Sequence, residues 1–309
     1  MPIQALSDIQ RSGQSAFASG GGGGGNPVLS QEASPAMPEA GTVRLFARSV
    51  GGRMLPAYIG PSGLNSALQP LIASNKIAWA NPNGNSTALG LMGIALTATG
   101  TATAANVATT NIHTAIRRLE YAVTTAATTA VAGFRSGVNQ YHIGEANTPF
   151  GGFTTVCRFG PSRGQASNAT RRAFVGMTSN TAAPTDVDPS ATAAWANLIG
   201  VGHDAADANW QIMHRTGTGT TTKINTGIPK AYNDNTEMFE VSIFTAPTGT
   251  PSVTVQLRRL SDDLTFTHTI TSNLPAATTL LGFQAYNSAG GTSSVMGIAL
   301  ASLYIETDY

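Results

Sequence analysis

Alternation of apolar and polar residues runs through the C-terminal part of the chain, from about residue 136 to residue 309, and it limits the fold more than any other feature. Side chains on a β-strand point alternately to opposite faces, so a period of two indicates strands with one buried face. The runs are FTTVCRFG from Phe153, FEVSI from Phe239, VTVQLR from Val253, LTFTHTI from Leu264 and the largely apolar SSVMGIALASLYIE, which ends at Glu306. Because Gly, Pro, Asn and Asp separate these runs, we expect 136–309 to form an antiparallel, jelly-roll-like sandwich with the last strand in a central position.

The first 41 residues have the composition of an extended arm. Gly20 to Gly25 form an unbroken glycine run, and three prolines follow it. So dense a run of glycine has too much backbone entropy to hold regular structure by itself. Two alternatives stay open: a flexible tail, or a peptide that becomes ordered when a partner covers its apolar residues. Those candidate attachment residues are Ile3, Leu6, Ile9 and Phe17.

Residues 42–60 carry the signature of a β-hairpin. Alternating residues precede Gly51-Gly52, and the segment RMLPAYIG returns after this turn. Two adjacent glycines accept the positive φ angles of a tight two-residue turn. Because two strands alone are marginal in water, we expect the hairpin to need a partner surface or further copies of itself.

Residues 61–135 form a connector rich in Ala, Gly and Thr, in which one helix is expected at about 109–124. Apolar residues at spacings of four, three and four predict a single stripe on this helix, and Thr109 or Thr110 could cap its start. The stripe is short, so a core helix and the neck of a trimeric coiled coil stay open as alternatives. The stripe consists of Ile112, Ile116, Leu119 and Val123.

The charge content of the chain excludes several functional classes. Charged residues make up 11% of the sequence, against about 25% in an average soluble domain. Neutral polar faces of this kind are typical of permanent assemblies, and a net charge of +1 without basic runs argues against a nucleic-acid partner. The longest apolar run, from Leu89 to Leu96, is far shorter than the roughly 20 residues of a membrane span. The N-terminus lacks a secretory signal pattern, so we expect a soluble protein made without export.

The stretch GHDAADANWQIMH, residues 202–214, is the one segment that resembles a chemical site. Alternation from Asn209 onward places His214 on a strand face with Trp210, roughly 13 Å along the strand from the loop. Asp204 and Asp207 have the spacing of a turn in which a carboxylate accepts backbone N–H groups. We therefore predict a turn leading into a strand, with a structural ion held by Asp204 and Asp207 as the surviving alternative.

Elsewhere the chemistry-bearing residues form no recognisable motif. Phosphate-loop, zinc-protease and nucleophile-elbow patterns are absent. Asp262 and Asp263 are adjacent in a probable turn, where neighbouring side chains diverge, so they do not make a glycosidase pair. The lone cysteine, Cys157, occupies an alternating position that favours burial in a core. The sequence therefore predicts no catalytic residue, no cofactor and no enzyme activity.

The order of several segments resembles structural proteins of tailed bacteriophages. PEAGTVRLFARSVGGRMLPAYIGPSG is similar to the hairpin after an N-terminal attachment arm, and TTNIHTAIRRLEYAVTTAATTAVAGFR is similar to a neck element. GGFTTVCRFG, RRAFVGMTS, NLIGVGHDAADANWQIMH, KINTGIP and SLYIETDY resemble a C-terminal β-sandwich head of tail-fibre and other virion proteins. The resemblance spans most of the chain and carries over no catalytic motif.

The resemblance implies a homotrimeric tail fibre or tail appendage of the virion, assembled in the host cytoplasm. Its arm would attach to other virion proteins of the tail, the baseplate or the portal region. A host-surface glycan or protein is an open further partner of the head. Neither nucleic acid nor membrane insertion is implied. The alternatives are a capsid decoration or head-fibre protein and a tailspike-like polysaccharide depolymerase.

Overall fold

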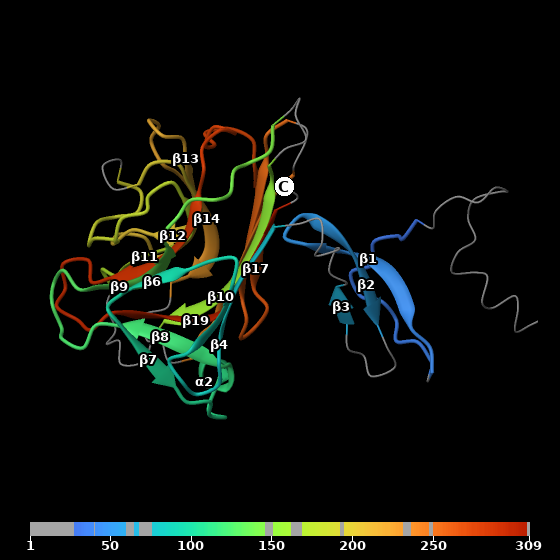
Figure 1. Cartoon of the computed structure of the whole chain (residues 1–309), viewed down its shortest axis with the longest axis horizontal. Helices are drawn as coiled ribbons and strands as arrows, with labels where there is room; N and C mark the ends of the chain where they lie inside the picture. The colour runs from blue at the N-terminus through green and yellow to red at the C-terminus, as the bar shows by residue number, and fades with distance from the viewer. Residues whose placement is uncertain are drawn as a thin grey trace, which may run out of the picture. The chain divides into compact units, whose positions relative to one another are not determined.

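The computed structural model describes residues 28–39, 41–59, 65–67, 76–145, 151–161, 169–191, 195–230, 236–246 and 250–307 (Figure 1). The chain divides into two compact units. The first comprises 1–50 and 54–70, and the second comprises 51–53 and 71–309. The predicted attachment residues Ile3, Leu6, Ile9 and Phe17 lie outside the described residues. Among those described, no helix is long and apolar enough to cross a lipid bilayer.

A three-stranded sheet forms the described part of the first unit. Its strands are β1 (Arg44–Val50), β2 (Arg53–Ile59) and β3 (Asn65–Ala67), in that order. Gly51 and Gly52 join β1 to β2 with φ angles of 55° and 89°, so the predicted hairpin at 42–60 is confirmed. Two-residue hairpin turns require such positive angles because their twist matches that of the strands.

The described end of the predicted arm is attached to this hairpin. Gln31 forms a parallel bridge with Ala47, and the Glu32 N–H donates to the Ala47 carbonyl at 3.0 Å. Arg44 and Glu32 form an ion pair at 2.8 Å. This part of the arm therefore adds to the edge of β1.

The second unit is an antiparallel sandwich of two sheets, which confirms the mainly β fold (Figure 1). The larger sheet has the order β17-β16-β15-β10-β19-β4-β5, with β8 on β19 and β7 on β8. Its strands are β4 (Lys76–Pro82), β5 (Leu89–Met92), β7 (Thr101–Ala105), β8 (Arg118–Ala122), β10 (Phe153–Pro161), β15 (Phe239–Thr245), β16 (Val253–Arg259), β17 (Thr265–Ile270) and β19 (Gly297–Thr307).

The facing sheet has seven strands in the order β14-β13-β12-β11-β18-β9-β6. They are β6 (Leu96–Thr99), β9 (Val131–Ser136), β11 (Arg172–Thr178), β12 (Leu198–His203), β13 (Asn209–Arg215), β14 (Thr222–Pro229) and β18 (Gly282–Ser288). The inner faces of the two sheets enclose one large hydrophobic core. On β16, for example, Val253, Val255 and Leu257 are buried while the intervening residues are partly exposed, as the alternation predicts. The last strand, β19, is buried along most of its length between β10 and the strands β4 and β8.

The sandwich begins well before residue 136, where the sequence analysis placed its start. Strands β4 to β8 and most of β9 precede this position and belong to the two sheets. At Gly100 the chain passes from β6 in one sheet to β7 in the other, with a φ of 80°. A Cβ at Gly100 would lie 2.8 Å from the Ala122 carbonyl oxygen, so this corner needs a glycine.

The helix expected at 109–124 is wrong. The structure forms only α2 (Ile112–Ala115), in which Asn111 and Thr114 make a capping box. At Ile116 the backbone becomes extended (φ −82°, ψ 131°), and β8 follows, paired with β7 and β19. Tertiary pairing therefore overrides the local helical spacing.

The predicted stripe is consequently divided among different surroundings. Ile112 and Ile116 are half-buried beside α2. Leu119 lies in the main core of the sandwich, whereas Val123 packs against a separate small cluster of Ala130, Ala289 and Met296. Leu119 is therefore not available on the surface for a helical neck between copies.

Candidate functional site

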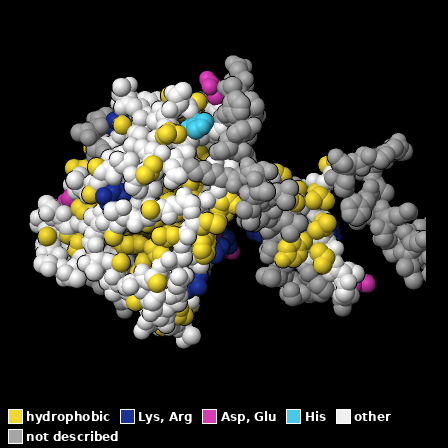
Figure 2. All heavy atoms as spheres, viewed as in Figure 1, with side chains coloured by type: hydrophobic (Ala, Val, Ile, Leu, Met, Phe, Trp, Pro, Cys, Tyr) yellow, Lys and Arg dark blue, Asp and Glu magenta, His cyan; other side chains and the backbone are white. Residues whose placement is uncertain are grey.

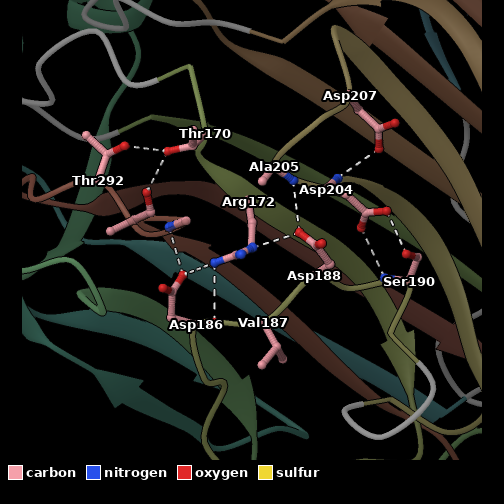
Figure 3. A network of polar contacts seen from close by, with 12 residues as sticks. Thr170, Arg172, Asp186, Val187, Asp188, Ser190, Asp204, Ala205, Asp207 and Thr292 are labelled. Carbon is pink, nitrogen blue, oxygen red and sulfur yellow. Dashed lines mark hydrogen bonds and ion pairs between the residues drawn. The ribbon is translucent and has the colours of Figure 1, made fainter.

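A dense network of charged side chains surrounds the predicted turn at 204–207 (Figure 3). It joins β11, the segment between β11 and β12, the turn between β12 and β13, and β14. We call it the charged network. Its members are Arg172, Asp186, Asp188, Asp204, Asp207 and Lys223.

Asp204 and Asp207 form the predicted turn. The Asp204 N–H donates to Asp207 Oδ2 at 2.8 Å, and the Asp207 N–H donates to the Asp204 carbonyl at 3.2 Å. A side-chain acceptor of this kind stabilises a tight turn because it replaces a backbone partner. The turn predicted from the AADAN spacing is therefore confirmed.

A lysine ammonium occupies the space between the two turn carboxylates. Lys223 Nζ lies 2.7 Å from Asp204 Oδ2 and 2.7 Å from each oxygen of Asp207. Burial alone would lower the pKa of Lys223, but the hydrogen bonds from its ammonium to Asp204 and Asp207 outweigh burial and raise this pKa. Ser190 also donates to Asp204, from its Oγ at 2.6 Å and its N–H at 3.2 Å. These protein groups already neutralise both carboxylates.

Arg172 links two further aspartates. Its Nε donates to Asp188 Oδ1 and its Nη1 donates to Asp186 Oδ1, each at 2.7 Å. The Gly290 N–H donates to Asp186 at 2.8 Å, and the Ala205 N–H donates to Asp188 at 2.9 Å. Although burial favours the neutral acid, the hydrogen bonds from Gly290, Ser288 and Arg172 lower the pKa of Asp186.

These contacts hold a long connection against the outer face of the seven-stranded sheet. Asp186 and Asp188 belong to the segment between β11 and β12, and so does Trp195. The indole of Trp195 stacks on Tyr286, with ring centroids 5.3 Å apart and 5° between the planes, and it also contacts Phe174. With Leu198 and Met213 these rings form a second hydrophobic cluster. The charged network therefore closes a small core on the side of the sheet opposite to the main one.

The two histidines of the 202–214 stretch have separate surroundings. His203 is fully buried with its ring edge against Trp210, 4.8 Å between centroids. Burial and the nearby positive Arg171 and Lys230 lower its pKa well below the usual value. His214 accepts or donates at the Asn273 carbonyl, 3.1 Å from Nδ1, and burial lowers its pKa also. The prediction that His214 lies apart from the aspartates is confirmed.

Lys230 completes the surroundings of the turn. Its side chain is buried, and Nζ donates to the Ala205 carbonyl at 3.0 Å and more weakly to the Asp204 carbonyl at 3.4 Å. Burial, followed by the positive charge of Arg171, lowers the pKa of Lys230 to about 8. Sequence reasoning missed both lysines. The available signal was their placement at the two ends of one alternating run, KINTGIPK, beside the strand that follows the turn.

The other groups considered from sequence are not placed for catalysis. Asp262 pairs with Arg259 and Asp263 with Arg258, each at 2.6 Å, so the adjacent carboxylates diverge as predicted. Cys157 is completely buried, as predicted, and burial raises the pKa of its thiol. Within the described ranges, no group of three or more His, Cys, Asp or Glu residues is arranged to hold a metal ion.

No family model matches the chain, and no curated protein matches it. Among solved structures it is similar to a protein of unknown function from Shewanella oneidensis, with 14% identity, a TM-score of 0.46, and 78% of this chain and 90% of that chain covered. Arcelin-5, a lectin-like defense protein from Phaseolus vulgaris, shares 12% identity with a TM-score of 0.47 over 76% of this chain and 98% of its own. The carbohydrate recognition domain of Emp47p shares 7% identity with a TM-score of 0.47 over 77% and 98%. Likenesses at this level assign no function to the chain.

Proposed function

We propose that the chain is a non-enzymatic structural protein of a tailed bacteriophage virion, a trimeric tail appendage. The N-terminal arm would attach it to other virion proteins, and the β-sandwich would face outward. The sequence resemblance motivates the virion assignment. One structural observation supports an assembled state: the three-stranded first unit exposes much of its apolar surface.

The first unit has a very small core of its own. Its buried cluster contains only Phe46, Ala57 and Ile59. Small sheets with so little buried area are marginal without a covering surface. Several large apolar side chains of this unit are exposed instead: Val28, Met37, Val43, Leu45 and Met54. In a virion, further copies or neighbouring proteins would cover these side chains.

The surface of the sandwich is consistent with a permanent assembly. Figure 2 shows neutral polar atoms over most of the viewed face, with hydrophobic side chains among them and few charged ones. Many of the charged groups are paired within the fold, as in the charged network. Neutral faces can be brought together without removing ions from water.

Light scattering coupled to size-exclusion chromatography tests the trimer. Each copy has a mass of 31.7 kDa, so three copies have a mass of 95.1 kDa (3 × 31.7). We expect this mass for the full-length protein at micromolar concentration. A stable monomer would contradict the proposal.

Antibody labelling of purified particles tests the location. We expect gold particles at the tail, whereas labelling over the capsid would support the head-fibre alternative. Deletion of residues 1–41 should leave the soluble oligomer intact and abolish incorporation into particles. Unlabelled particles, with antibody that binds the free protein, would contradict a virion role.

A further inference from the structure

One segment of the sandwich contains no charged residue. Between Lys76 and Arg117 the chain has neither Asp, Glu, Lys nor Arg. With 11% charged residues overall, these 40 positions (77–116) would be expected to hold about four (0.11 × 40). Charged residues are the usual cover of solvent-exposed strands and loops, so this segment lacks the chemistry of an ordinary free surface.

The segment supplies the last strands of both sheets on one side of the sandwich. Strand β5 ends the larger sheet and β6 ends the smaller one, and residues 93–95 connect the two. Strand β7 pairs only with β8 and forms a further edge. We call this side, made by β5, β6 and β7 together with Trp79 of β4, the charge-free flank.

Exposed apolar side chains gather on the charge-free flank. Met92 is the register partner of Trp79 across β4 and β5. A Cβ at Gly90 would lie 3.0 Å from the Trp79 ring, so the indole lies against this glycine beside Met92. Of the seven exposed large hydrophobic side chains described in the second unit, four belong to 77–116: Trp79, Leu91, Met92 and Val107.

The edges on the opposite side of the sandwich carry the features that block strand addition. The turn before β17 holds Asp262 and Asp263, paired with two arginines. Strand β14 ends at Pro229, and its pairing with β13 shifts register near Asn209. Charges, prolines and bulges are the usual protection of edge strands. Strand β5, with the sequence LGLM, has no charge and no proline, and its outer side has no paired strand.

We propose that the charge-free flank is the surface through which copies of this chain contact one another. This inference rests on the proposed trimer and names its interface on the sandwich. A partner of either net charge would find no complementary group there, whereas a second copy brings an equally neutral surface. The free N–H and C=O groups along an edge strand are satisfied by another strand. The exposed Trp79, Leu91 and Met92 would then be buried without desolvating any ion.

Lysine substitutions on the flank provide the test. We expect Met92→Lys, and more strongly Leu91→Lys with Met92→Lys, to convert the 95.1 kDa trimer (3 × 31.7 kDa) to monomer in light scattering. An unpaired ammonium in an interface should raise the dissociation constant at least about a hundredfold. Leu264→Lys is the matched control, since Leu264 is exposed beside β17 on the other side. Its oligomer should be unchanged, and thermal unfolding should show that each variant is folded.

Cross-linking supplies a second measurement that does not depend on a destabilising substitution. A photoreactive benzoylphenylalanine at position 92, in oligomers mixed from ¹⁴N- and ¹⁵N-labelled copies, should join to residues 77–116 of another copy. A folded Met92→Lys, Leu91→Lys protein that stays trimeric, or cross-links that map elsewhere, would overturn the inference and leave the proposed trimer standing. A wild-type monomer would instead refute the proposed trimer, and this inference with it.

Discussion

Arg172 offers the most direct test of what the charged network does. Its guanidinium holds Asp186 and Asp188, each at 2.7 Å, and so fixes the segment between β11 and β12. We consider two substitutions, Arg172→Ala and Arg172→Lys. Alanine removes both hydrogen bonds, whereas lysine keeps the charge but loses the planar fork that reaches two partners at once.

The two hydrogen bonds of Arg172 differ in strength because their acceptors differ in exposure. The Asp186 side chain is 9% exposed and that of Asp188 is 39% exposed. A bond to a buried charged group contributes about 1.5–3 kcal/mol, while a largely exposed ion pair contributes about 0–1 kcal/mol. Asp186 keeps the Gly290 N–H as a donor. We therefore expect Arg172→Ala to lower the free energy of unfolding by about 3 kcal/mol, and Arg172→Lys by about half as much.

Urea denaturation followed by circular dichroism measures the loss, and hydrogen exchange locates it. Faster exchange is expected at 186–190 and 195–198, while the main core strands should exchange as in the wild type until global unfolding. Arg158→Ala is the matched control, because Arg158 pairs with Glu240 at 2.6 Å but is 50% exposed. It should cost less than about 1 kcal/mol. If both arginine variants lose equally little stability, the charged network does not hold this segment.

Three further outcomes are expected. Gly93→Ala should lower the free energy of unfolding by about 3 kcal/mol or more, because the new Cβ would overlap the Ile77 carbonyl at a φ of 66°. Gly84→Ala has the same backbone strain (φ 64°) in open space, and should cost only about 1 kcal/mol in the same urea titration. The buried thiol of Cys157, with its raised pKa, should react with a thiol reagent only after unfolding; labelling of the native protein at neutral pH would contradict its placement. Because the pKa of Asp186 is lowered in the folded state, its contribution is present above the unfolded pKa of about 3.9 and lost as pH falls below it; unfolding of Asp186→Asn should depend less on pH in that acid range than unfolding of the wild type.

The strands of the sandwich head could be predicted because their pattern is local. On β16 and β15 every second residue is buried, and this alternation is visible without knowing any partner strand. The turn at 204–207 was predictable for the same reason, since its acceptor and donor lie three residues apart. The hairpin turn at Gly51-Gly52 likewise depends on the conformational freedom of two adjacent residues.

Features that depend on distant partners could not be predicted. Leu119 has helical spacing to Ile116 and Val123, but its backbone pairs with Ala104 and Leu300 in a sheet. The partners of Asp204 and Asp207 come from 16 to 19 positions further along the chain, at Lys223. Neither contact leaves a periodic trace in the sequence, because each is set by which strands the fold brings together.

The distribution of charge connects these features to assembly. Lys223 and Arg172 are used to fix a turn and a long connection by pairing with aspartates inside one copy. Charges paired internally cannot attract a partner, and residues 77–116 contain none at all. A protein with few charges that directs them inward keeps a neutral outer surface, which separate soluble domains seldom tolerate because neutral surfaces associate. The same economy of charge that makes the 202–214 stretch resemble a chemical site therefore favours a chain whose function is to be assembled with copies of itself.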